Sequence, residues 1–421
     1  MFQTFKNAFK IPDLRNKILF TLFVILLYRI GVAVPVPYIQ TGIENVFGSG
    51  SIFDYLNLLS GGALEQATLF ALGVSPYINA SIIIQLLAIA IPALEKLSKE
   101  GEEGRKKLDS ITRYVTVALA LVTSFGYYML MKNYNAVTNT GAFTAVVIIA
   151  CYCAGAALVM WLAEKIDEKG IGNGISMILF ASIISRLPTS VITSIRNIST
   201  GSLEWWVALL VFLGALAIIV LIVYVNDAER RVPVQYAKRV VGRKMYGGQS
   251  THLPMKVNMS GVMPIIFAQS IASIPATIAA FTGKTDGWVN TWFGTNSIPY
   301  AIIYFLLIIF FAYFYSTIQF NPIEVANNLK KNGGFIPGFR PGKPTSEFIQ
   351  KVLNKITLFG ALYLGIIAVV PILVAHFSQS ASLTGVSLGG TSIIIVVGVA
   401  LETVRALEAQ MLMRNYKGFL D

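Results

Sequence analysis

Long apolar runs constrain the fold of this 421-residue chain more than any other feature of its sequence. A helix that crosses a bilayer needs about 20 mostly apolar residues. Ten such runs occur, at about 18–37, 71–92, 113–131, 142–163, 174–192, 205–225, 259–281, 298–320, 356–375 and 391–412. Because lipid offers the backbone no hydrogen bonds, each run is expected to be helical. The sequence therefore predicts an all-α multi-pass membrane protein with ten transmembrane helices.

The charge distribution gives an orientation to these spans. Only 13% of the residues are charged, whereas a soluble domain has about 25%. Of the 33 Lys and Arg residues, 28 lie in the two terminal segments and the even-numbered loops, four lie in the odd-numbered loops, and Arg29 lies in the first run. Since Lys and Arg concentrate in cytoplasmic loops, we expect both termini to be cytoplasmic. An even number of spans agrees with that alternation.

Two basic loops, at about 226–258 and 321–355, are larger than orientation requires. Tyr, Phe, Gly and Pro are interleaved with their basic residues, which favours folded, protruding hairpins over flexible tethers. Loops longer than about 12–15 residues are usually functional. We therefore expect a docking surface for an acidic partner or for RNA phosphates. The alternative is a positive loop that serves orientation alone.

The sequence offers no set of residues suited to catalysis, metal binding or a cofactor. Cys151 and Cys153 lie in an apolar run with no His nearby, and two thiols alone cannot complete a tetrahedral zinc site. His252 and His376 are far apart in the chain. The glycine-rich run at 170–174 follows no strand, so it predicts a tight turn before the fifth run rather than a nucleotide site. We expect no metal, no cofactor and no enzymatic activity.

The segment LNLLSGGALEQATLF, residues 56–70, fits neither of its neighbours. It contains too much Gly, Asn, Glu and Gln for a bilayer span, and too much Leu, Ala and Phe for an ordinary exterior loop. A re-entrant segment of this kind is tolerated only where protein or water covers it.

Several motifs in order along the chain resemble one family. They are ALGVSPYINASIIIQLL (71–87), KEGEEGRKKLDSITRY (99–114), GIGNGIS (170–176), QSTHLPMKVNMSGVMP (249–264), GFIPGFRPGKPT (334–345) and GGTSIIIVV (389–397). The chain is identified by these motifs as similar to the SecY family of protein-conducting channels, in its bacterial and plastid branch. The resemblance runs from the first span to the last.

The resemblance implies two inverted halves of five spans each, at about 1–200 and 201–421, around a central pore. It also implies that residues of about 53–70 form the plug segment, a short half-helix folded into the outer funnel of the resting channel. The plug residues would be Asn57, Leu58, Leu59, Ser60, Gly61, Gly62, Ala63 and Leu64. Asn57, Glu65 and Gln66 would face water, and the two glycines would give the backbone freedom to move. The alternative is a static re-entrant cap.

Six aliphatic residues would form the constriction of the pore. Residues four apart share a helix face, as Ile78 and Ile82 do in the second span and Leu179 and Ile183 in the fifth. The resemblance adds Ile266 in the seventh span and Ile395 in the tenth. Taken singly, each is typical of ordinary helix packing. Together they are expected to form an aliphatic ring that excludes water and binds no particular sequence.

The resemblance further implies a lateral gate, where the second and third spans face the seventh and eighth. Gln85 and Asn258 lie near these walls and are candidates for hydrogen bonds across the closed gate, with bonding inside one helix as the alternative. Arg340, in the FRPG turn, is the first candidate for docking SecA or the ribosome, with Arg243 and Lys244 next.

The resemblance implies a passive channel in a bacterial cytoplasmic membrane. It would translocate unfolded secretory polypeptides and release membrane helices sideways into lipid. The implied partners are SecE, SecG, the SecA ATPase, the ribosome, signal peptides and nascent chains, with SecDF and YidC as further candidates. A secondary transporter of a small solute is the alternative. The absence of carboxylates and histidines at mid-depth in the spans and the large basic loops argue against it.

Overall fold

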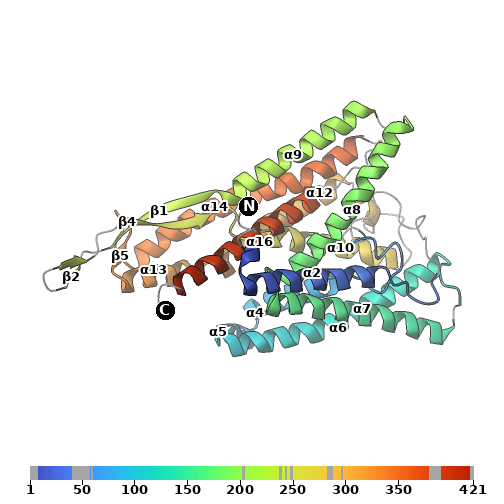
Figure 1. The fold of residues 1–421 in the computed structure, drawn as a ribbon, viewed down its shortest axis with the longest axis horizontal. Helices are drawn as coiled ribbons and strands as arrows, with labels where there is room; N and C mark the ends of the chain where they lie inside the picture. The colour runs from blue at the N-terminus through green and yellow to red at the C-terminus, as the bar shows by residue number, and fades with distance from the viewer. Residues whose placement is uncertain are drawn as a thin grey trace.

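The computed structural model describes residues 8–39, 57, 60–139, 141–201, 204–236, 239–241, 244–246, 250–281, 288–294, 297–378 and 390–417. Ten long helices lie at the ten apolar runs, as the sequence predicts (Figure 1). They are α2 (Pro12–Val32), α4 (Ser75–Ala90), α6 (Glu102–Asn133), α7 (Ala142–Lys169), α8 (Gly174–Ser199), α9 (Trp205–Asp227), α10 (Met263–Phe281), α12 (Ile298–Gln319), α14 (Lys343–Ser378) and α16 (Gly390–Lys417).

Six of the described helices are long and apolar enough to cross a membrane by themselves. The bent pair α4 and α5 (Pro92–Lys99) makes a seventh, with an angle of 101° between its members. The bend falls at Ile91, whose extended backbone precedes Pro92, because a proline disfavours the helical conformation of the residue before it. The described part of α10 is shorter, α2 carries charged residues near both ends, and α16 carries them in its C-terminal half.

Two helices begin well before the apolar runs that predicted them. α6 begins at Glu102 and α14 at Lys343, whereas the runs begin near 113 and 356. The additional turns carry Lys, Arg, Glu and Asp. Hydropathy detects the part of a helix that lies in lipid, so polar turns that continue the same helix beyond the bilayer escape it.

The two large basic loops fold together into one small unit. β1 (Glu229–Tyr236) pairs antiparallel with β4 (Ser250–Lys256) and with β5 (Gly334–Phe335), in the order β4-β1-β5. β2 (Arg239–Val241) and β3 (Lys244–Tyr246) form a separate two-stranded ribbon. Alternate residues Val232 and Val234 of β1 pack with Ile349 and Leu353 of α14. The strands are an addition to the all-α prediction, and they project from the helices beside α13 (Pro322–Lys331) (Figure 1).

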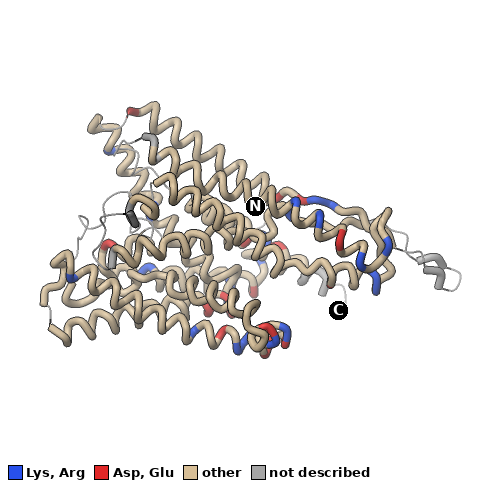
Figure 2. Tube along the Cα trace, turned by 180° about the vertical axis from the view of Figure 1, so that it is seen from behind, with Lys and Arg blue, Asp and Glu red and all other residues tan. Residues whose placement is uncertain are grey.

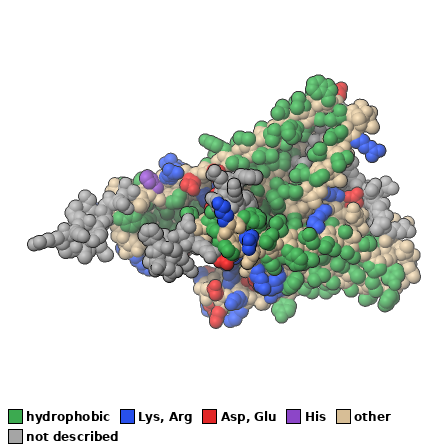
Figure 3. Space-filling view, viewed as in Figure 1, with side chains coloured by type: hydrophobic (Ala, Val, Ile, Leu, Met, Phe, Trp, Pro, Cys, Tyr) green, Lys and Arg blue, Asp and Glu red, His purple; other side chains and the backbone are tan. Residues whose placement is uncertain are grey.

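The charges and the apolar surface are separated along the molecule. Figure 2 shows Lys, Arg, Asp and Glu gathered toward the end that carries these strands and α5, which we call the charged end. Hydrophobic side chains cover much of the helical part of the face in Figure 3. α9 is the extreme case, since Ile222 and Val225 are its only buried residues. A helix with apolar side chains exposed around it is suited to lipid.

The ten helices form two groups of five. α2, α4, α6, α7 and α8 pack together in the N-terminal group, and α9, α10, α12, α14 and α16 pack together in the C-terminal group. The two groups meet chiefly where α10 contacts α4 and α6, and where α16 contacts α8. One apolar core extends through both groups.

Candidate functional site

The six aliphatic residues predicted to form the pore ring belong to one buried apolar cluster. They are Ile78 and Ile82 of α4, Leu179 and Ile183 of α8, Ile266 of α10 and Ile395 of α16, each no more than 4% exposed. The fold thus brings together residues from four helices and from both groups.

An aliphatic cluster at this place has two physical properties. Its side chains have no hydrogen-bonding groups, so water and ions entering it would lose their hydration without replacement. It also offers no directional contacts, so it has no chemical preference among polypeptides. Such a cluster can seal a path without recognising what moves through it.

The described part of the plug segment lies against this cluster. Residues 60–67 form consecutive turns rather than a helix, and Ala63 is a buried member of the same cluster. Gly61 and Gly62 adopt positive φ values of 69° and 94°, in the left-handed region that glycine tolerates best. Leu58 and Leu59 lie outside the described residues.

The expectation that Asn57 faces water is wrong. Its residue exposure is 2%. Its amide donates a 2.7 Å hydrogen bond to Glu65 Oε2, and its Oδ1 accepts from the Glu65 backbone N–H at 3.1 Å. These bonds close the chain on itself and satisfy the buried amide. Glu65 is half-buried, and Gln66 is exposed as expected.

The predicted gate residues each bond within their own group of helices. Gln85 donates to Ser81 Oγ one turn earlier in α4, at 3.0 Å. Asn258, just before α10, donates to Asn226 at the end of α9, at 2.8 Å. The two predicted gate residues therefore do not pair with each other in this structure.

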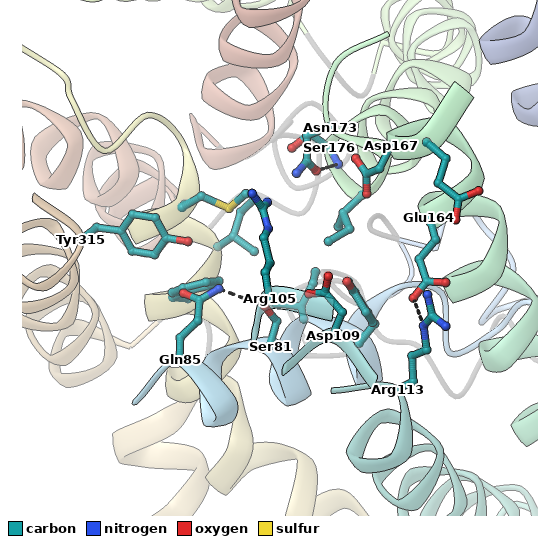
Figure 4. Close-up of a pocket in the computed structure, with 17 residues that line it drawn as sticks. Ser81, Gln85, Arg105, Asp109, Arg113, Glu164, Asp167, Asn173, Ser176 and Tyr315 are labelled. Carbon is teal, nitrogen blue, oxygen red and sulfur yellow. Dashed lines mark hydrogen bonds and ion pairs between the residues drawn. The ribbon is translucent and has the colours of Figure 1, made fainter. Parts of the chain in front are cut away.

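A cavity of about 550 Å³ lies beside the ring, between it and the charged end (Figure 4). Ile78 and Ile266 of the ring line it, together with residues of α4, α6, α7, α8, α10 and α12. Gln85 and Tyr315 lie on one side of the close-up, Arg113 and Glu164 lie on the opposite side, and Arg105 lies between them. The cavity is thus bounded on one side by the aliphatic side chains of Ile78 and Ile266 and on the others mostly by polar and charged side chains.

The charged wall of the cavity is held by specific bonds. Arg113 Nε donates to Glu164 Oε1 at 2.7 Å. Asp167 accepts from the Gly174 N–H at 2.8 Å, and Asn173 caps α8 by accepting from the Ser176 N–H. Gly172 has a φ of 78°, so the run at 170–174 forms the predicted turn before α8.

Two of the three docking candidates, Arg340 and Lys244, belong to the described residues. Arg340 is exposed, in a turn whose backbone is held by the Thr345 hydroxyl, which donates to the Arg340 carbonyl at 2.8 Å. Phe339 and Phe348 pack with their ring centroids 4.2 Å apart. Lys244 begins β3, and Arg243 lies outside the described residues. The described residues contain no group of three or more His, Cys, Asp and Glu side chains that could hold a metal ion.

Three polar partners of the plug segment were missed by the sequence analysis. Tyr28 of α2, Tyr127 of α6 and Arg186 of α8 each bond to it. Arg186 was counted only among the few basic residues of the odd-numbered loops. The sequence signal that could have found this contact is the pair of opposite charges: Arg186 lies on the sparsely charged side, and Glu65 lies in the segment 56–70.

Fold and site together define a multi-pass membrane protein of the channel type, with two helical groups that close on an aliphatic constriction. The family model of SecY matches residues 68–404, which is more than half of the chain. The chain belongs to the SecY family. The protein translocase subunit SecY of Streptomyces coelicolor is 46% identical over 443 residues, and that of Mycobacterium bovis is 44% identical over 445 residues; each comparison covers 100% of both chains.

Solved structures share the fold at much lower identity. One described as a protein-conducting channel has a TM-score of 0.68 at 18% identity, and covers 94% of this chain and 92% of its own. Canine Sec61, solved in a ribosome-channel complex from the endoplasmic reticulum, has a TM-score of 0.65 at 17% identity with the same coverage. Ten helices in two halves around a central pore is the fold of this chain as well.

Proposed function

We propose that this chain is a passive channel that moves unfolded secretory polypeptides across a bacterial cytoplasmic membrane and releases membrane helices sideways into it. The observation that carries the proposal is the burial of the six candidate ring residues, which come from both groups of helices, in one apolar cluster. Membership of the SecY family supports the channel over the small-solute transporter.

In the resting state the ring and the plug segment close the path together. The ring excludes water, and the plug segment covers it with Ala63 against the same cluster. An unfolded chain passes by displacing the plug segment and spreading the aliphatic side chains, which bind none of its residues. The ring therefore acts as a non-specific seal around the chain rather than as a recognition site.

The lateral gate lies where α10 contacts α4 and α6. Gln85 of α4 and Tyr315 of α12 line the same cavity from the two groups of helices, so Gln85 serves the gate, while Asn258 braces the start of α10 against α9. Interhelical polar contacts in membranes are worth about 0.6–2 kcal/mol. An apolar signal helix can replace contacts of that strength by its own packing.

The charged end is the cytoplasmic face, with both termini on that side, and the two halves divide at about 200/201. The chain contributes no catalytic chemistry, so its partners supply the energy: the SecA ATPase or a translating ribosome, with SecE and SecG as companion subunits and SecDF and YidC as further partners. Canine Sec61, with the same fold, was solved with a ribosome. The exposed Arg340 presents positive charge that such partners would meet, and Arg243 and Lys244 are the next candidates from the sequence.

Reversing the charge of Arg340 tests the docking surface. We expect Arg340→Glu to weaken binding of SecA to the channel in nanodiscs by roughly tenfold and to slow SecA-driven export of a secretory precursor. The reason is that a guanidinium donates charge-assisted hydrogen bonds to an acidic group of the partner, whereas a carboxylate repels that group. Folding should be unchanged, since the Arg340 side chain is exposed.

The matched control is Lys132→Glu, an exposed reversal in the last turn of α6, on the proposed outer side. It should leave SecA binding and export at the level of the unaltered protein. Normal binding and export by Arg340→Glu would remove Arg340 from the docking surface.

A further inference from the structure

The plug segment is fastened by polar contacts to the N-terminal group of helices. The Tyr28 hydroxyl of α2 lies 3.3 Å from the Ser60 carbonyl oxygen and 2.9 Å from Ser182 Oγ of α8. The Tyr127 hydroxyl of α6 donates to the Leu64 carbonyl at 2.5 Å. Two backbone bonds, Val36 N–H to Ala67 and Leu69 N–H to Val34, continue the attachment along the chain that follows α2.

One of these contacts is an ion pair. Nη2 of Arg186, in α8, lies 2.8 Å from Glu65 Oε2, the oxygen that also accepts from Asn57. Both charged side chains are less than 30% exposed, so water screens the pair less than it screens a surface pair. The carboxylate therefore joins the plug segment to α8 through a charge-assisted bond.

A second guanidinium lies at the same turn. A Cβ atom on Gly61 would lie 3.0 Å from Nη1 of Arg29, and one on Gly62 would lie 3.4 Å from Nη2 of Arg186. The glycines thus let both guanidinium groups approach the plug backbone. In the described part of the structure, Nη1 of Arg29 is buried without a hydrogen-bond partner, so a second positive charge lies beside the turn at Gly61.

The polar contacts described above for the plug segment all lie within the N-terminal half, whereas Ala63 belongs to the apolar cluster that also contains Ile266 and Ile395 of the C-terminal group. Moving α10 away from α4 and α6 would therefore break none of the polar contacts described above. Separation of the two halves and release of the plug segment are therefore two events, each with its own free-energy cost.

We propose that the Glu65–Arg186 ion pair is a latch that keeps the plug segment on the N-terminal helices and sets how readily the closed channel opens. The proposal rests on the proposed function, in which this segment closes the pore. Glu65 and Arg186 are positioning residues: they touch no substrate and act by holding the plug segment over the ring.

The test is ion leakage through purified channels in planar bilayers, with Glu65→Gln, Arg186→Gln and the charge swap Glu65→Arg with Arg186→Glu. Each single variant should raise the leak about threefold to tenfold, the range for a pair that is partly shielded from water and hydrogen-bonded. Glu65→Gln should have the larger effect, because it leaves the half-buried Arg186 guanidinium without its carboxylate, whereas Arg186→Gln leaves Glu65 bonded to Asn57. The charge swap should return the leak to within about twofold of the unaltered channel.

Two further variants of the channel serve as controls. Gln66→Ala, beside Glu65 and exposed, should leave the leak unchanged. Deletion of 57–67 should leak more than any single variant. Suppose that the deletion leaks but both single variants behave like the unaltered channel, or that the charge swap leaks as much as the single variants. Either result would contradict the ion-pair latch and leave the plug role of the segment intact. If the deletion itself does not leak, the plug role fails and the latch fails with it.

Discussion

Deletion of residues 57–67 is expected to raise the resting ion conductance of the channel by about 100-fold. The segment buries Ala63, Leu64 and Ala67, each no more than 4% exposed. Loss of that apolar contact removes about 3 kcal/mol from the closed state, and each 1.4 kcal/mol changes a ratio of populations tenfold. Single-channel recording in planar bilayers measures the effect as a change in open probability.

The outcome separates a plug from a static cap. A movable plug that blocks a sealed path gives a large leak when it is removed, and transport of precursors with normal signal sequences continues. Unchanged conductance would show that the ring alone seals the pore and that this segment is a structural cap.

The second large effect is expected at the ring. Replacing both Ile82 and Ile266 by Asn puts two amides where the side chains are 3% and 4% exposed. Each change loses about 3 kcal/mol of apolar burial, and an amide in an apolar site attracts water because it lacks a partner. We expect a leak at least tenfold above the unaltered channel, and export of precursors whose signal sequences are too weak for it.

The control keeps the size and changes only the shape. Ile82→Leu with Ile266→Leu should cost less than about 1.5 kcal/mol and should preserve both the seal and the discrimination. Export assays with a graded series of signal sequences measure the discrimination. If the Asn pair still rejected defective signals and held ions, these two positions would not belong to the constriction.

The spans were predictable because lipid imposes a strong and local requirement. An apolar run such as 205–225 is visible letter by letter, and α9 follows it almost residue for residue. The polar starts of α6 and α14 were not visible, since a helix that leaves the membrane obeys propensity and packing rather than hydropathy. The sheet joining β1 and β5 pairs residues about 100 apart, such as Gln235 with Phe335, and no local pattern announces such a contact.

The site was predictable in part and for different reasons. The spacing of Ile78 with Ile82 and of Leu179 with Ile183 gives a shared face, but only the family resemblance joined the four helices. The burial of Asn57 and the pairing of Glu65 with Arg186 were missed, because those partners are set by tertiary contacts. Glu65 and Arg186 are 121 residues apart, and their composition alone suggested exposure.

The measurement that bears most directly on the central claim is site-specific cross-linking of an arrested export substrate. Photoreactive side chains placed one at a time at the six ring positions should each react with a secretory chain halted in transit, because all six belong to the cluster that closes the path. Ile83, which is 39% exposed in the same helix as Ile78 and Ile82, should react with lipid instead. A halted chain that reacts with none of the six would contradict the account, since the path would then run elsewhere.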